Sequence, residues 1–281
     1  MSPTPETPQH AVVTGATSGI GRWIARGLAE AGYSLSLIAR DAARADVARA
    51  WVAEAVPDAA IDIFEADLSS LSETRRAAAA ISAHHPHLRL LVNNAGLLCE
   101  RREVTAEGHE MTLATNLLTP LALTEALFPA LAAAGAARVV MVGSSTSDRA
   151  TIDPDNLELT HGWRMTRAYA RSKLALLMMS RVWAEHLKPH GVTLNVVHPG
   201  LVATSLIRHG GMDQLFWNLL GRFALTPQQG ADTPLYACLA PELAGKTGLY
   251  LKRRREASPN RLVFDTGLVS RVESAVAQLL G

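Results

Sequence analysis

Cysteine is almost missing from this chain, since Cys99 and Cys238 are the only two in 281 residues. Two distant thiols exclude a disulfide framework, and they exclude a metal site built from cysteines. Such sparse cysteine suits a reducing compartment. We therefore expect a cytoplasmic protein.

Aromatic residues and net charge are also scarce, at 5% and +1. A nearly neutral chain has no general electrostatic attraction for nucleic acid or an anionic membrane. Apolar residues still make up 48% of the chain, mostly as alanine, leucine and valine. A chain of this length and composition predicts a single domain over residues 1–281 with helices packed on a buried parallel sheet.

Signals for export and for membrane insertion are weak. Residues 1–10 are polar, contain three prolines and lack the basic and apolar regions of a signal peptide. Residues 117–137 carry only one charge, Glu125, and are long enough to span a bilayer. That stretch is rich in alanine, contains Pro120 and runs directly into a predicted strand. We therefore expect a buried or subunit-facing helix and no membrane span.

Short apolar runs alternate with segments of helical periodicity along the whole chain. Seven strands are predicted, at residues 11–14, 34–39, 61–66, 88–92, 138–142, 192–197 and 248–251. The predicted helices begin after the turn near residue 20 and then cover residues 41–55, 69–84, 105–133, 165–187, 226–239 and 268–280. This order predicts the α/β class, a doubly wound parallel sheet (Rossmann fold) with helices on both faces.

Two charged clusters need a separate interpretation. The basic run at residues 252–255 is expected to be a solvated loop, with a membrane-surface or anionic-ligand role as the alternative. His84, His85 and His87 lack a neighbouring acid or cysteine at ligand spacing, so we expect no metal site there.

A glycine-rich turn, Thr14-Gly15-Ala16-Thr17-Ser18-Gly19-Ile20-Gly21, follows the first strand. Such a turn brings backbone N–H groups and a helix N-terminus against a pyrophosphate.

Tyr169 and Lys173 lie four residues apart in a predicted helix and therefore share a face. An ammonium beside a phenol favours the phenolate, so Lys173 is expected to lower the pKa of Tyr169 and make it a usable acid or base. With the glycine turn, this pair predicts dinucleotide binding and proton transfer between a carbonyl and an alcohol.

In this order the motifs resemble those of the short-chain dehydrogenase/reductase family from about residue 10 to the C-terminus. The matching positions are Thr14, Gly15, Gly19, Gly21, Asp67, Leu68, Asn93, Asn94, Ala95, Gly96, Asn116, Ser144, Tyr169, Lys173, Pro199, Gly200, Leu201, Val202, Ala203 and Thr204. The resemblance implies that Ser144, Tyr169, Lys173 and Asn116 are catalytic. Ser145 remains a rival for Ser144.

The resemblance also implies a nicotinamide dinucleotide cofactor. The expected cofactor-binding residues are Gly15, Thr17, Ser18, Gly19, Ile20, Gly21, Arg40, Asp67, Leu68, Asn93, Asn94, Ala95, Gly96, Tyr169, Lys173, Pro199, Gly200, Val202 and Thr204. Asn93 and Asn94 have an alternative role, in which they only tie neighbouring strands together.

The end of the second strand favours NADP over NAD. An acid at that position usually grips the ribose hydroxyls of NAD, but here Ala39 is followed by Arg40. A small residue leaves room for a 2′-phosphate, and a guanidinium can bind it. The alternative is that Arg40 pairs with Asp41 or another surface acid.

Residues 144–168 form a longer insertion than in many members of the family, and they resemble the retinol-dehydrogenase-like branch. That branch acts mostly on bulky apolar carbonyls and alcohols. Residues 205–225 correspond to a substrate lid, with an oligomer contact or plain core as the alternative. The expected lid residues are Leu206, Met212, Leu215, Phe216 and Trp217.

Together these features predict an NADP(H)-dependent oxidoreductase that interconverts a carbonyl and a secondary alcohol on a bulky hydrophobic substrate. The rivals are a non-catalytic NADP-binding regulatory protein, an enzyme of the same family acting on an imine or alkene, and a methyltransferase. The family tendency implies a homodimer or homotetramer. No nucleic-acid partner is expected.

Overall fold

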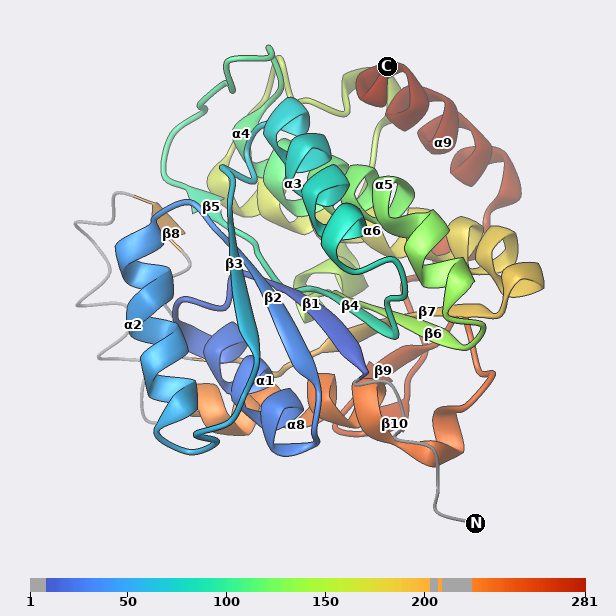
Figure 1. Cartoon of the computed structure of the whole chain (residues 1–281). Helices are drawn as coiled ribbons and strands as arrows, with labels where there is room; N and C mark the ends of the chain where they lie inside the picture. The colour runs from blue at the N-terminus through green and yellow to red at the C-terminus, as the bar shows by residue number, and fades with distance from the viewer. Residues whose placement is uncertain (1–8, 203–206, 209–223) are drawn as a thin grey trace.

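A mostly parallel sheet forms the centre of the computed structural model, which describes residues 9–202, 207–208 and 224–281 (Figure 1). The strand order is β10-β9-β7-β6-β4-β1-β2-β3. All neighbours are parallel except β9 and β10. The strands are β1 His10–Thr14, β2 Ser34–Ala39, β3 Ile61–Glu65, β4 Leu90–Asn93, β6 Ala137–Val142, β7 Val192–His198, β9 Tyr250–Lys252 and β10 Arg255–Glu256. The predicted seven-stranded parallel sheet is confirmed, with one short antiparallel strand added at its edge.

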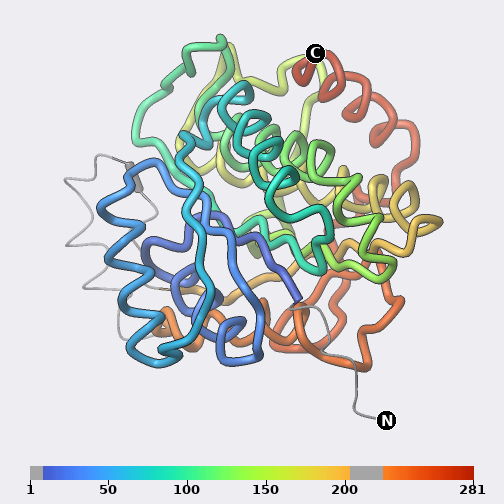
Figure 2. The backbone as a smooth tube through the Cα atoms, viewed as in Figure 1, coloured from blue at the N-terminus to red at the C-terminus, as the bar shows by residue number. Residues whose placement is uncertain are grey.

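Helices cover both faces of this sheet (Figures 1 and 2). One layer holds α1 Gly19–Glu30, α2 Ala42–Ala53 and α8 Pro227–Leu239, and the other holds α3 Leu71–His84, α5 Thr119–Ala133 and α6 Met165–Leu187. The C-terminal helix, α9 Thr266–Leu280, packs beside the second layer through Val272 and Val276. Two separate apolar cores result, one on each side of the strands.

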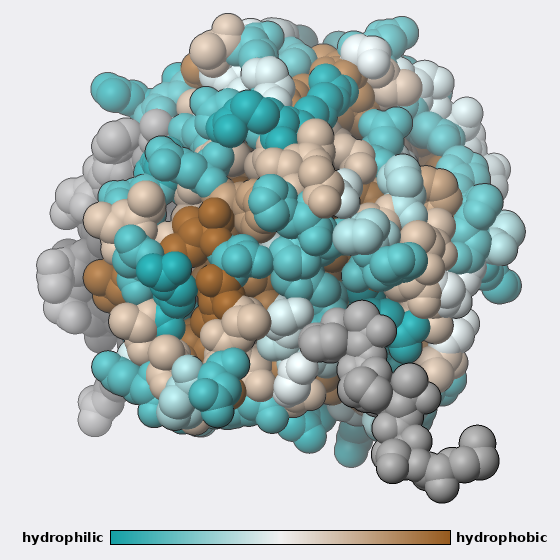
Figure 3. Space-filling view, in the orientation of Figure 1, coloured by the Kyte–Doolittle hydropathy of each residue, from teal (hydrophilic) through white to brown (hydrophobic). Residues whose placement is uncertain are grey.

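Apolar side chains also reach the surface on the side shown in Figure 3. The view is mixed in character, with an apolar area over the β2–β3 edge of the sheet, beside α2. The edge strand β3 is only partly covered, since Ile63 and Phe64 are half-buried and Asp62 and Glu65 are exposed. Charged residues at such an edge discourage pairing with another strand.

The long helix predicted over residues 105–133 begins later than expected. Helical structure starts with α4 Met111–Leu113, continues through a π-helical turn at Ala114–Leu118 and runs into α5. Gly108 has φ +92°, which is incompatible with a helix, and the Glu110 carboxylate caps the new start by accepting from the Leu113 N–H at 2.7 Å. The sequence prediction overlooked Gly108 as a helix breaker and Glu110 as the residue that caps the helix.

Within the described residues, Met111–Ala133 is the one helical stretch that is long and apolar enough to cross a membrane by length and composition. Of its most apolar window, 67% is buried inside the protein. Its position in the α3–α5 layer agrees with the predicted buried helix.

The basic run at residues 252–255 forms a β-hairpin, in which the predicted solvated loop is confined to the exposed turn at Arg253 and Arg254. Arg253 and Arg254 have φ values of 50° and 60° and connect β9 to β10 in a two-residue turn. Lys252 pairs with Asp148 at 2.5 Å, and Arg254 pairs with Asp232. Two of the four positive charges are therefore matched by acids, and the two turn residues remain exposed.

Candidate active site

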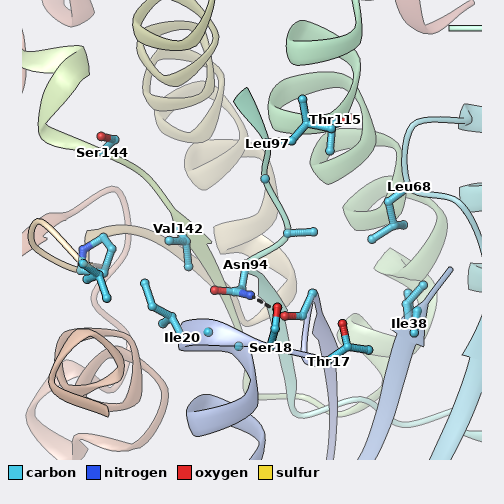
Figure 4. Close-up of a pocket in the computed structure, with 18 of the residues that line it drawn as sticks. Thr17, Ser18, Ile20, Ile38, Leu68, Asn94, Leu97, Thr115, Val142 and Ser144 are labelled. Atoms are coloured by element: carbon cyan, nitrogen blue, oxygen red, sulfur yellow. Dashed lines mark hydrogen bonds between the residues drawn. The ribbon is translucent and has the colours of Figure 1, made fainter. Parts of the chain in front are cut away.

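A cleft of about 690 Å³ opens at the carboxyl ends of β1, β2, β4, β6 and β7. This is the edge at which open parallel sheets bind ligands. Figure 4 shows Thr17 and Ser18 of the glycine turn near Asn94, with Ile38 and Leu68 on one side and Ser144 on the other. The cleft thus joins the motifs that are far apart in the sequence.

Two glycines of the turn, Gly15 and Gly21, lie where a side chain would not fit. Gly15 has φ +65°, and a Cβ there would lie 3.0 Å from Ala95 Cα. A Cβ on Gly21 would lie 2.2 Å from the Gly15 carbonyl oxygen and 2.4 Å from Asn94 Nδ2. The Ser18 hydroxyl makes no capping hydrogen bond at the start of α1. The positive end of the helix therefore faces the cleft with backbone donors suited to a diphosphate.

Thr14 and Asn94 connect the glycine turn to β4. Thr14 Oγ1 accepts from the backbone N–H groups of Asn94 and Ala95, both at 2.9 Å. Asn94 Nδ2 donates to the carbonyl oxygens of Thr14 at 2.9 Å and Gly15 at 3.3 Å. Asn94 also lines the cleft, so it combines the two roles that the sequence left open.

Asn93 is not among the residues that line the cleft, and its assignment to cofactor binding stays a prediction. Its side chain is 3% exposed and Nδ2 donates to Thr124 Oγ1 at 3.1 Å. Successive residues of a strand point to opposite sides, so Asn93 and Asn94 cannot both face the ligand. Asn93 ties β4 to α5.

Two arginines lie at the far end of the cleft from Ser144. Arg40 follows the buried Ala39, and its Nη1 is 3.9 Å from Asp67 Oδ2. The two side chains are 60% and 35% exposed, so this pair is weak and leaves Arg40 available. Arg44 also lines the cleft. Sequence reasoning missed Arg44, although its four-residue spacing from Arg40 at the start of a predicted helix was a usable signal.

Most of the other predicted cofactor residues lie where expected. The cleft is lined by Gly15, Thr17, Ser18, Gly19, Ile20, Gly21, Asp67, Leu68, Ala95, Gly96, Pro199, Gly200 and Val202. Thr204 and the predicted lid residues Leu206, Met212, Leu215, Phe216 and Trp217 lie outside the described residues. The cleft wall also includes Leu97, Thr115 and Thr146, which the sequence did not single out, and His198, which directly precedes the Pro199-Gly200 motif.

Ser144, Tyr169 and Lys173 converge on one part of the cleft. Lys173 is buried, its Nζ donates to the Val142 carbonyl oxygen at 2.8 Å, and it lies 5.9 Å from the centroid of the Tyr169 ring. Ser144 follows β6 and lines the cleft, whereas Ser145 is exposed and is not among the lining residues. The geometry therefore favours Ser144 over Ser145.

The acid–base properties of this group differ from the sequence expectation. Burial raises the pKa of Tyr169, and the side chain of Ser144 acts in the opposite direction. Burial also lowers the pKa of Lys173 to about 8. The predicted lowering of the Tyr169 pKa by Lys173 is therefore not seen among the protein's own groups, because loss of hydration outweighs the hydrogen bond with Ser144.

Asn116 makes structural hydrogen bonds beside the cleft, and its predicted catalytic role stays a prediction. It is fully buried within the π-helical turn. Its Oδ1 accepts from the Leu97 N–H at 2.8 Å, while Nδ2 donates to the Leu97 carbonyl oxygen at 3.0 Å and to Ser172 Oγ at 3.2 Å. The amide thus fixes the cleft wall at Leu97 and the helix that carries Tyr169.

Comparison with known proteins identifies the family. A family model described as short chain dehydrogenase matches residues 9–213, which is well over half of the chain. This chain belongs to the short-chain dehydrogenase family.

Similar proteins also support the predicted branch of short-chain dehydrogenases. Polyprenol dehydrogenase of Mus musculus is 39% identical over 286 residues, covering 99% of this chain and 85% of the relative. Retinol dehydrogenase 12 of Bos taurus is 32% identical over 270 residues, covering 96% and 85%. The solved structure of a blue fluorescent protein from a metagenomic library, in complex with NADPH, is 27% identical with a TM-score of 0.68, covering 87% of this chain and 96% of that one. The resemblance to the retinol-dehydrogenase-like branch is confirmed.

In this short-chain dehydrogenase a polar network supports Ser144 from behind. The Tyr250 hydroxyl lies 3.3 Å from the Ser144 carbonyl oxygen and 3.1 Å from Asp148 Oδ1. Lys252 Nζ donates to Asp148 Oδ2, and His198 Nδ1 accepts from the Ser145 N–H at 3.3 Å. Burial, helped by the nearby positive charge of Lys252, lowers the pKa of His198 to about 4, so this ring stays a neutral acceptor.

The histidines of residues 84–87 make local contacts. His85 Nε2 pairs with Asp62 at 2.8 Å and its ring stacks on His10, with centroids 3.5 Å apart. His84 and His87 bond to backbone carbonyl groups. Across the part of the chain that the structure describes, no group of three potential ligands could hold a metal ion.

Proposed function

We propose that this short-chain dehydrogenase is an NADP(H)-dependent oxidoreductase that interconverts a carbonyl and an alcohol on a bulky apolar substrate. The observation that carries the proposal is the convergence of Ser144, Tyr169 and Lys173 beside the glycine turn in one cleft. A cleft with a phosphate-binding end and a proton-transfer end suits hydride chemistry on a carbonyl.

Three side chains divide the proton step in this proposal. A bound nicotinamide cofactor supplies or accepts the hydride. Tyr169 donates a proton to the substrate oxygen in reduction and accepts it in oxidation, while the Ser144 hydroxyl holds the same oxygen. Lys173, already fixed to the Val142 carbonyl group, binds the ribose and offsets the cost of forming a buried phenolate at Tyr169.

The preference for NADP rests on the far end of the cleft. Arg40 and Arg44 both line it beside the small, buried Ala39, and the one ion pair that they form among the described residues, Arg40 with Asp67 at 3.9 Å, is weak and exposed. Guanidinium groups bind phosphate through paired N–H donors. The similar solved structure with NADPH supports this preference.

The apolar substrate is supported by the relatives. Polyprenol and retinol, in the names of two relatives, are long apolar alcohols whose hydroxyl is at the end of a chain. Their chemistry widens the predicted secondary alcohol to include primary alcohols. An apolar substrate also agrees with the composition of the predicted lid.

Turnover on a substrate panel tests the proposal. NADPH oxidation is measured with hydrophobic ketones, aldehydes and imines, and NADP reduction with the matching primary and secondary alcohols. We expect kcat/KM to rise by orders of magnitude from short-chain to polyene or alicyclic substrates, at about 0.8 kcal/mol for each buried methylene group. Faster turnover of a sugar or an amino-acid-like compound than of every apolar substrate would contradict the apolar assignment.

The same panel separates the enzyme from a non-catalytic NADP-binding regulatory protein. Saturable NADPH binding with no turnover on any substrate would favour the regulatory role. Turnover only on imines or activated alkenes would assign a different bond type to the same site.

Cytoplasmic location and a homodimer or homotetramer remain part of the proposal. The helix α9 packs against α6 and covers part of one of the long helices through which subunit contacts were expected. Light scattering on the purified chain gives the oligomeric state, and fractionation of the producing cells gives the location.

A further inference from the structure

A second cavity, of about 290 Å³, lies between the 144–168 insertion and the start of α6. Four of the described residues that line it are arginines and none is acidic. We call it the arginine pocket; its lining is Arg149, Ala150, Thr151, Arg164, Thr166, Arg167, Ala170 and Arg171.

The arginine pocket is separate from the active site although both use α6. Residues on an α-helix follow one another at roughly 100° around the axis. Arg167 and Arg171 share one face of α6, and Tyr169 lies on roughly the opposite face. Lys173 shares the Tyr169 face, and neither residue lines the arginine pocket.

Arg171 is the buried member of this group, with 7% of its surface exposed. Its Nη1 donates to the Asn156 carbonyl oxygen at 2.6 Å, whereas Nε has no hydrogen-bond partner. A buried donor without a partner costs free energy, and a charged donor costs more than a neutral one. The Arg171 guanidinium therefore carries an unsatisfied donor within the wall of the pocket.

The surrounding charges also call for an anion. Burial lowers the pKa of Arg171 and the positive charge of Arg167 adds to this effect, while Asp153 opposes it. Across the described residues none of the four arginines forms an ion pair. Like charges gathered in this way repel one another unless a counterion is present.

The start of α6 adds a further positive field to the pocket. Arg164 is the N-cap residue, its side chain makes no capping hydrogen bond, and the first turn contains no acid. Acids are normally favoured at this end because the helix dipole is positive there. Arginine at the N-cap and again at Arg167 therefore runs against the local electrostatic preference, as expected if an anion binds there.

We propose that the arginine pocket is a binding site for a phosphate-type dianion. A planar guanidinium presents paired N–H donors that match phosphate oxygens, and the pocket gathers four of them. The phosphate can belong to a small soluble phosphomonoester or to a lipid headgroup, since the same contacts recognise both.

Calorimetric titration of the full chain with inorganic phosphate and with glycerol 3-phosphate tests this site. The titrations use protein saturated with NADPH, so that phosphate held at the glycine turn or at Arg40 in the cleft does not count. Arg164→Gln and Arg167→Gln should each weaken binding by roughly 10- to 100-fold, the value of one charge-assisted contact. The matched control Arg49→Gln removes an exposed arginine of α2 and should leave binding unchanged.

Two further experiments distinguish a lipid headgroup from a soluble phosphomonoester as the ligand. Vesicles of phosphatidylcholine with phosphatidic acid should retain the protein, in an Arg167-dependent manner, if a lipid headgroup is the ligand. Binding of glycerol 3-phosphate without retention on such vesicles assigns the pocket to a soluble phosphomonoester. Either result supports the site.

Absence of binding at millimolar phosphate in low salt would overturn the proposal, as would binding that survives both glutamine variants. Arg171 also holds the Asn156 carbonyl group, so its removal risks unfolding the insertion. The test therefore rests on the exposed Arg164 and Arg167, with thermal denaturation used to verify that each variant is folded.

Discussion

The two ends of the cleft are built in different ways. The proposed phosphate-binding end consists of backbone groups and glycines packed so closely that a Cβ on Gly21 would meet the Gly15 carbonyl group at 2.2 Å. The proposed catalytic end consists of the side chains of Ser144, Tyr169 and Lys173, which arrive from β6 and α6.

This contrast determines what each end tolerates. At the backbone end the shape of the chain binds the ligand, so an added atom disrupts the site even when no functional group is lost. At the side-chain end the cavity can keep its shape while a single hydroxyl is removed. We therefore expect substitutions at the two ends to separate cofactor binding from turnover.

The largest effect is expected from Tyr169→Phe. The change removes the proton donor but retains the ring, so turnover should fall by on the order of 10²- to 10⁴-fold. NADPH affinity, measured by fluorescence titration, should stay within about threefold, which is less than the value of one hydrogen bond. Tyr33→Phe, on a half-buried tyrosine of the α1–α8 side, is the matched control. Turnover like that of the unchanged enzyme would remove Tyr169 from the mechanism.

Gly21→Ala should weaken cofactor binding, whereas Tyr169→Phe should mainly reduce turnover. The new methyl group would overlap the Gly15 carbonyl group and the Asn94 amide, at a cost of about 1–3 kcal/mol or more. We expect NADPH affinity or thermal stability to fall accordingly. The control Gly267→Ala adds the same atom in α9, where the nearest heavy atom is 3.6 Å away. Equal behaviour of the two variants would show that the glycine turn is not tightly packed.

Arg40→Ala sharpens the comparison within the cofactor end. A guanidinium–phosphate contact contributes roughly 1.5–3 kcal/mol, so NADPH should bind about one to two orders of magnitude more weakly while NADH changes little. Ala39→Asp should go further because its carboxylate repels a 2′-phosphate and accepts from a ribose hydroxyl. Arg49→Ala is the control. If the ratio of NADPH affinity to NADH affinity is unchanged in both Arg40→Ala and Ala39→Asp, Arg44 becomes the candidate for selecting NADPH.

Tyr250→Phe examines the support behind Ser144. Removing the hydroxyl leaves the Ser144 carbonyl group and Asp148 without this donor. The net value of one hydrogen bond, about 0.5–1.5 kcal/mol, predicts a kcat roughly 2- to 10-fold lower. Unaltered NADPH affinity is expected, because Tyr250 acts on the catalytic end alone. A loss of NADPH affinity with unchanged kcat would show that Tyr250 acts on the cofactor end of the cleft, which would contradict this prediction.

The smallest effect concerns Glu107, which supports the cofactor end from outside. Its carboxylate accepts from the N–H groups of Leu71 at 2.7 Å and Ser72 at 3.0 Å at the start of α3, and from the hydroxyls of Ser70 and Ser72. Glu107→Gln should cost about 1 kcal/mol of unfolding free energy, as loss of a helix cap does, without changing kcat.

The stabilisation by the Glu107 carboxylate should decrease as the pH falls. Backbone and hydroxyl donors from Ser72, Leu71 and Ser70 outweigh the opposing effect of burial and lower the pKa of Glu107 from 4.5 to about 2. The stabilisation is therefore complete above about pH 4.5 and is lost as the pH falls toward 2. Urea unfolding at several pH values should show the two proteins converging in acid. A constant difference across this range would contradict the role of the carboxylate charge.

The same contrast explains what the sequence could predict. The glycine turn and the Tyr169–Lys173 pair are local patterns, so their positions followed from spacing alone. Asn93 and Asn116 are fixed by partners on distant elements, Thr124 and Leu97, and no local pattern shows which way their amides turn. The direction of the Tyr169 pKa depended on burial, which spacing does not report.

The arginine pocket could not be predicted from the sequence, because it is assembled from residues on separate elements. Its residues are spread over the insertion and the first two turns of α6, and only the folded chain brings Arg149 next to Arg171. The predicted helix boundaries for α6 were correct, at residues 165–187. The helical spacing of Arg167 and Arg171 was therefore available, but nothing in the sequence distinguished it from an exposed basic face.

The bonds from Asn94 to the Thr14 and Gly15 carbonyl groups have a consequence for the thermodynamics of cofactor binding. They hold the glycine turn in its ligand-ready conformation through the protein's own contacts. A preorganised loop loses little conformational entropy when it captures its ligand, so more of the contact energy remains as affinity. Cofactor binding at this end of the cleft should therefore need little rearrangement of the glycine turn. The turn is already ordered when the protein folds.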